Sequence, residues 1–71
     1  MAQPAQWRYC IAGCKVWVFY RKKWLAATVD SVGKVQDELT RATVITLEPR
    51  HILKRRVKDL WVRKSENDYP S

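Results

Sequence analysis

The chain has 71 residues, 46% of them hydrophobic, and carries 14 Lys and Arg against 7 Asp and Glu, for a net charge of +7. This length allows one small domain, which buries only about 60% of the surface that its unfolded chain exposes. No run reaches the ~20 apolar residues of a membrane span, and the N-terminus lacks the apolar region of a secretory signal. We predict one intracellular domain over residues 7–64, a disordered lead-in over 1–6 and a flexible tail over 65–71.

The charge balance indicates what kind of partner to expect. An excess of cations suits a polyanion such as nucleic acid, an acidic protein tail or an anionic membrane surface, although a merely soluble basic domain has the same composition. The 2 cysteines and 1 histidine cannot complete a four-ligand zinc site, so we predict neither a metal nor a cofactor. Cys10 and Cys14 are interpreted as packing groups in a reducing compartment.

The first patterned stretch covers residues 7–11. Trp7, Tyr9 and Ile11 occupy alternate positions, which is typical of a short strand or of an arm that covers one end of the domain. Ala12 and Gly13 then indicate a break.

Residues 14–32 carry the clearest pattern, two alternating runs of β-branched and aromatic residues joined by Arg21, Lys22 and Lys23. Period-two alternation predicts a pair of strands, and the all-cationic turn must face water. Large aromatics therefore crowd around one exposed basic hairpin tip, which favours a binding module over an enzyme. One face of the first strand is predicted to carry Val16, Val18 and Tyr20, and the other Lys15, Trp17 and Phe19. One face of the second strand is predicted to carry Leu25, Ala27 and Val29, and the other Trp24, Ala26 and Thr28.

A connection and a third strand follow. Residues 32–40 contain Gly33 and the acidic pair Asp37 and Glu38, and we predict an exposed hairpin loop. Residues 41–47 alternate again and predict a third antiparallel strand, so the three strands form a meander.

Residues 48–64 are ambiguous. A helical period places six residues on one stripe, five of them apolar: Ile52, Leu53, Arg56, Val57, Leu60 and Trp61. A strand period instead groups Ile52 with three cations, which is unfavourable for a half-buried strand. A compromise is a strand to Val57, one helical turn and a closing strand over 61–63. We favour helix for part of the segment. The predicted core comprises Val16, Val18, Leu25, Ala27, Val29, Val44, Leu53 and Val57, with either Trp17 or Trp24.

Several of these stretches resemble a known group of folds. Residues 13–18 (GCKVWV), residues 23–29 (KWLAATV) and the VKDL run at 57–60 are similar to the SH3-like small β-barrels of the Tudor and chromo-barrel group. The Val-Trp-Val and Trp-x-x-Ala-x-Val runs also resemble the N-terminal SH3-like subdomain of myosins. Residues 46–53 (TLEPRHIL) faintly resemble the stretch before the terminal helix of a chromodomain, with Leu47 in place of its tryptophan.

The resemblance implies a mainly β, SH3-like barrel that binds rather than catalyses. Tudor and chromo-barrel modules read methylated lysine or arginine in an aromatic cage, and some bind nucleic acid. By that analogy a histone tail or another peptide is a candidate partner, although the three cations at the hairpin tip would repel a lysine-rich tail. The candidate cage residues are Phe19, Tyr20, Trp24 and Trp61.

The basic C-terminal segment supports a different partner. Between positions 50 and 64 there are seven cations against the single acid Asp59. Such a run could contact successive phosphates, and the aromatics beside the hairpin tip could stack on bases. We expect a monomeric, non-catalytic module that binds DNA or RNA, with nuclear localisation favoured. A methylated-tail reader and a docking subdomain of a larger protein are the alternatives. The candidate nucleic-acid-binding residues are Arg21, Lys22, Lys23, Arg50, Lys54, Arg55, Arg56 and Lys58.

Overall fold

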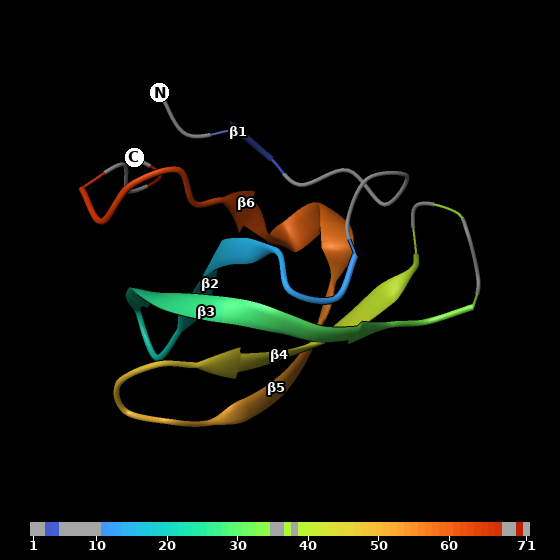
Figure 1. Cartoon of the computed structure of the whole chain (residues 1–71), viewed down its shortest axis with the longest axis horizontal. Helices are drawn as coiled ribbons and strands as arrows, with labels where there is room; N and C mark the ends of the chain where they lie inside the picture. Colours follow the sequence, from blue (N-terminus) through green and yellow to red (C-terminus); the bar gives the residue numbers. More distant parts are fainter. Residues whose placement is uncertain (1–2, 5–10, 35–36, 38, 68–69, 71) are drawn as a thin grey trace.

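The computed structural model describes residues 3–4, 11–34, 37, 39–67 and 70. They form one antiparallel sheet with the strand order β1, β6, β2, β3, β4, β5 (Figure 1). The predicted mainly β class, with bent antiparallel strands and a helical turn within 50–62, is confirmed. The elements are β1 (Gln3–Pro4), β2 (Lys15–Tyr20), β3 (Lys23–Val32), β4 (Arg41–Thr46), β5 (Ile52–Arg56), the 3-10 turn η1 (Val57–Asp59) and β6 (Trp61–Val62).

The β2–β3 hairpin forms as the alternation predicts. The strands pair from Lys15 opposite Thr28 to Tyr20 opposite Lys23. The two turn residues, Arg21 and Lys22, have φ angles of 51° and 64°. Positive φ at both positions is typical of a type I′ turn, whose twist matches that of the flanking strands. Lys23 therefore begins β3 rather than ending the turn.

The β4–β5 hairpin confirms the strand predicted at 41–47. Its loop is closed by a buried hydroxyl, because Thr46 Oγ1 accepts a hydrogen bond from the His51 N–H at 2.7 Å and donates one to the Pro49 carbonyl. The Glu48–Pro49 peptide bond is cis. The connection before β4, predicted as an exposed loop over 32–40, ends in a buried Thr40, while Asp37 and Leu39 are exposed.

The helix favoured for part of residues 48–64 is limited to the 3-10 turn η1. Residues 52–56 form strand β5, which pairs with β4 alone among the described strands. Its side chains alternate between two faces, and Ile52, Lys54 and Arg56 are exposed on the outer one. The compromise of a strand, one helical turn and a closing strand matches the structure to within about one residue at each end.

The core lies on the inner face of the curled sheet. Val16, Val18, Ala27, Val29, Val44 and Val57 are buried as predicted, and Leu25 and Leu53 pack half-buried against them. Trp17 is the buried member of the tryptophan pair, at 3% exposure. Cys14 also packs against this cluster, as predicted. The core also contains buried residues that were not predicted, namely Ala42, Leu60, Thr40 and Thr46.

The sheet is open, because its order runs from β1 to β5 without returning over the described residues. β1 lies within residues 1–6, which were expected to be a disordered lead-in, and it pairs with β6. The strand or arm predicted at 7–11 lies outside the described residues except for Ile11, which is exposed. In the tail, residues 65–67 are exposed and Pro70 is buried. The described residues contain no helix long and apolar enough to cross a membrane.

Candidate functional site

A cavity of about 480 Å³ opens beside the turn-proximal half of the β2–β3 hairpin. Its other walls come from β5, η1 and β6, which are distant from the hairpin in sequence. The cavity forms because η1 turns the chain from the edge strand β5 back to β6, beside β2. Its lining residues are Val18, Phe19, Trp24, Arg55, Lys58, Asp59 and Trp61.

Three aromatic rings of the cavity pack edge to face. Phe19 and Trp24 are opposite each other in the hairpin register, and their ring centroids lie 5.1 Å apart at an interplanar angle of 63°. The rings of Trp24 and Trp61 lie 6.4 Å apart at 81°. Edge-to-face contacts of this kind hold rings in fixed orientations. Phe19 is exposed and both tryptophans are half-buried, so the cluster offers ring surface to a ligand.

The fourth cage candidate does not join this cluster. Tyr20 follows Phe19 in β2, and consecutive strand residues point to opposite faces of a sheet. The Tyr20 ring lies 5.2 Å from the His51 ring, and the Arg21 guanidinium lies 5.2 Å from the Tyr20 centroid. The structure thus brings together three of the four candidates.

The charges that line the cavity sum to +1. Arg55 and Lys58 each contribute a positive charge and Asp59 a negative one. The Asp59 carboxylate is already engaged, since its Oδ2 lies 3.0 Å from the Arg56 Nε. The Arg55 Nη1 donates to the Lys54 carbonyl at 2.9 Å. The site therefore suits a flat neutral ring with an adjacent anion better than a lone cation. Asp59 was not a candidate, because the sequence alone does not place it beside the aromatics.

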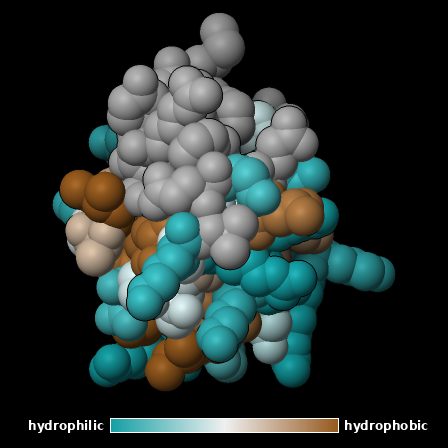
Figure 2. Space-filling view, turned by 90° about the vertical axis from the view of Figure 1, so that its right-hand side faces the viewer, coloured by the Kyte–Doolittle hydropathy of each residue, from teal (hydrophilic) through white to brown (hydrophobic). Residues whose placement is uncertain are grey.

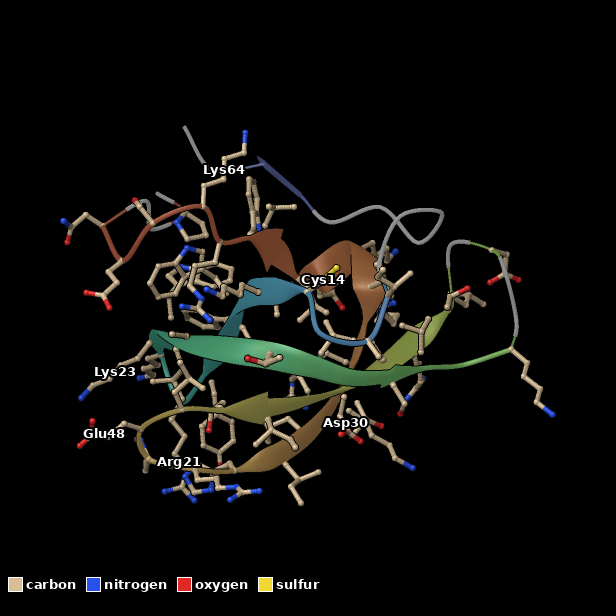
Figure 3. All side chains as sticks on the ribbon, in the orientation of Figure 1. Cys14, Arg21, Lys23, Asp30, Glu48 and Lys64 are labelled. Atoms are coloured by element: carbon tan, nitrogen blue, oxygen red, sulfur yellow. The ribbon has the colours of Figure 1, made fainter. Side chains whose placement is uncertain are left out.

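The cations at the hairpin tip form a separate group. Arg21, Lys22 and Lys23 are exposed, and in Figure 3 the labelled Arg21 and Lys23 lie at the same end of the sheet as Glu48 of the β4–β5 loop. Arg50, in that loop, is also exposed. The tip and the loop together form a basic end of the molecule.

The remaining cations of the 50–64 segment do not share one surface. Alternation along β5 places Arg55 toward the cavity and Lys54 and Arg56 on the outer face. Arg63 has a structural role, since its guanidinium donates hydrogen bonds to the main-chain carbonyls of Val16 at 3.3 Å and Ala27 at 3.1 Å.

Among the described residues no group of three or more His, Cys, Asp and Glu side chains could hold a metal ion. No family model, curated protein or solved structure matches this chain.

Proposed function

We propose that this chain is a non-catalytic, nucleic-acid- or chromatin-associated module that binds single-stranded nucleic acid. It would act as an intracellular, nuclear monomer of the Tudor and chromo-barrel kind. The observation that carries the proposal is that Arg55 and Lys58 line the same cavity as the Phe19, Trp24 and Trp61 rings. Aromatic faces beside cations are the combination that holds an unpaired base and its phosphate.

Each part of the site has a role in this proposal. An unpaired base stacks on the exposed ring surface of Phe19 and Trp24. Arg55 and Lys58 contact the phosphate on one side of that base. The nucleic acid strand then continues toward the hairpin tip, where Arg21 and Lys22 contact further phosphates. A duplex keeps its bases stacked on each other, so it would contact only the cations.

The test is fluorescence anisotropy of a labelled oligothymidylate and of a duplex, at low and moderate salt. We expect the single strand to bind more tightly, and both affinities to fall steeply with salt. Trp24→Leu should weaken single-strand binding by about 5- to 150-fold, the effect of losing one stacked base. Ile52→Ala is the matched control, because Ile52 is 69% exposed and does not line the cavity. A salt-insensitive complex, or equal affinity for Trp24→Leu and wild type, would contradict the proposal.

One observation favours a second function, a reader of methylated lysine or arginine. Asp59 lies on the cavity wall with the three aromatic rings, and a methylated ammonium binds aromatic faces with about 0.5–2 kcal/mol per contact. A carboxylate beside the rings would attract that cation.

Asp59→Asn separates the two functions because it changes them in opposite directions. Removing this negative charge should tighten oligonucleotide binding by about two- to fivefold, the usual scale for one exposed charge pair. A reader of methylated tails should instead lose affinity for a trimethyllysine peptide. The peptide arm uses matched trimethylated and unmodified peptides, and equal binding of both excludes the reader function.

A further inference from the structure

The outer face of β4 and β5 concentrates positive charge that the aromatic cavity does not use. Side chains alternate along both strands, so Arg41, Thr43, Lys54 and Arg56 face away from the core. In the strand register Arg41 lies directly opposite Arg56, and Thr43 lies opposite Lys54. Arg41 was not a candidate in the sequence analysis, because it precedes the basic 50–64 segment.

Like charges that face each other across two strands destabilise a sheet. Here Arg56 is partly neutralised by Asp59, at 3.0 Å. The structure shows no ionic partner for Arg41 or Lys54 among the described residues. An anion bound between Arg41 and Lys54, which are diagonal neighbours in the strand register, would offset both positive charges.

A hollow is present where such an anion would bind. A cavity of about 240 Å³ is lined by Arg41 and Lys54 together with the hydroxyl residues Ser31 and Thr43. A register shift between Val29 and Ser31 places Ser31 opposite Thr43. The cavity therefore combines two cationic donors with two hydroxyl donors, all of which suit phosphate oxygens.

Gly33 holds the Arg41 backbone at the end of this cavity. The Gly33 N–H donates to the Arg41 carbonyl at 2.8 Å. A Cβ atom at position 33 would meet that carbonyl oxygen at 3.1 Å, closer than an ordinary contact. The β3–β4 connection can therefore lie against β4 at this point. This end of the sheet lies on the side that faces the viewer in Figure 2, where hydrophilic and hydrophobic residues are interspersed.

We propose that Arg41, Lys54, Ser31 and Thr43 form a second phosphate-binding site, which takes a phosphodiester of the same nucleic acid chain. This inference rests on the proposed function for the identity of the ligand. β5 presents Arg55 to the aromatic cavity and Lys54 to the outer face. A single-stranded nucleic acid that crosses the β5 edge therefore contacts both sites. We expect a trinucleotide to occupy only one of the two sites.

The first experiment is an amide NMR titration of the whole chain with inorganic phosphate, using chloride at equal ionic strength as the reference. We expect phosphate-specific shifts at Ser31, Gly33, Thr43 and Lys54. This readout does not depend on nucleic acid, so it tests the anion site even if the proposed function fails. Shifts equal to those in chloride would overturn the proposal.

The second experiment measures the affinity of a trinucleotide and of an oligothymidylate of about 12 nucleotides, which is within the range of single-strand site sizes. Arg41→Gln/Lys54→Gln should weaken the longer ligand about tenfold. It should also reduce the log–log salt slope by about 0.7, because the site binds one phosphodiester and single-strand binding loses about 0.7 per phosphate contact. Affinity for the trinucleotide should stay within about twofold of wild type.

The matched control is Lys15→Gln/Lys64→Gln, which removes the same charge from residues that line neither cavity. An equal loss in both double variants would show that only net charge matters and would overturn the site.

Asp30→Asn supplies a gain-of-affinity test. Asp30 is exposed beside Ser31, and its removal should tighten binding of the longer oligonucleotide about twofold. Weaker binding of this variant would also count against the site.

Discussion

The guanidinium of Arg63 lies against the backbone of two neighbouring strands. Its Nε donates to the Val16 carbonyl at 3.3 Å and its Nη2 to the Ala27 carbonyl at 3.1 Å, and its Cζ lies 5.8 Å from the centroid of the Trp17 ring. The Arg63 main-chain N–H also donates to the Lys15 carbonyl at 3.0 Å. A lysine ammonium carries its donors on a single nitrogen and lacks the planar fork that reaches both main-chain carbonyls. Arg63 is therefore a structural cation.

Arg63→Lys should lower the free energy of unfolding by about 1–3 kcal/mol, because charge-assisted hydrogen bonds to two half-buried carbonyls are lost. Urea unfolding followed by tryptophan fluorescence measures this change. Arg50→Lys is the matched control, since Arg50 is exposed in the β4–β5 loop, and it should shift stability by less than about 0.5 kcal/mol. Equal losses in the two variants would show that the Arg63 contacts are not stabilising.

Part of the aromatic cavity could be predicted from the sequence. Phe19 and Trp24 were both candidates, but the two-residue turn that sets them opposite each other was predicted as three residues, 21–23. The separation of Tyr20 from Phe19 follows from the same alternation, since adjacent strand residues face opposite ways. The position of Asp59 could not be predicted, because it depends on where η1 turns back toward β6. Arg41 was missed because its partner Arg56 becomes its neighbour only through strand pairing.

The β2–β3 turn uses residues that fit its geometry poorly. Arg21 and Lys22 both have positive φ, a conformation that costs an ordinary L-residue roughly 1 kcal/mol and that Asn-Gly adopts readily. Both side chains are exposed. The proposed function gives these cations a use, since they would contact phosphates.

Arg21→Asn/Lys22→Gly should raise the free energy of unfolding by about 1 kcal/mol, because the turn strain is relieved. The same variant should bind oligonucleotide more weakly, with a log–log salt slope lower by up to about 1.4. Urea unfolding and anisotropy provide the two measurements. Arg21→Gln/Lys22→Gln removes the same charge without favouring the turn, so it should weaken binding without gaining stability. A stability gain in both variants would point to charge repulsion rather than turn strain.

The elements of this sheet differ in how far their sequences determine them. β2, β3 and β4 have buried inner faces, so apolar residues recur with period two and predict the strands. Among the described strands β5 pairs with β4 alone, and its outer face carries Ile52, Lys54 and Arg56, which obscures the strand period. A helical stripe arises there by coincidence, because Leu53 belongs to β5, Val57 to η1 and Leu60 to the turn into β6. The pairing of β1 with β6 leaves no periodic signal in a two-residue strand.

Over the whole molecule, the core depends on contacts between segments distant in the chain. Leu60 is fully buried at 0% exposure and packs in one cluster with Val16 and Val18 of β2 and Val44 of β4. It follows η1, at the point where the chain leaves the edge strand for β6. Leu60 thus shares one core with residues of β2 and β4, and its chain neighbours Asp59 and Trp61 line the aromatic cavity.

Leu60→Ala should therefore lower the free energy of unfolding by about 2–5 kcal/mol, through lost burial and the cavity left behind. A chain this small has roughly 5 kcal/mol or little more to lose, so the variant should be partly unfolded at room temperature. Leu39→Ala makes the same chemical change at 61% exposure and should shift stability by less than about 0.5 kcal/mol. Urea unfolding measures both variants, and amide NMR of the folded fraction reports on the Trp61 environment. If Leu60→Ala proved as stable as Leu39→Ala, the core would not depend on the link between β6 and the remaining strands.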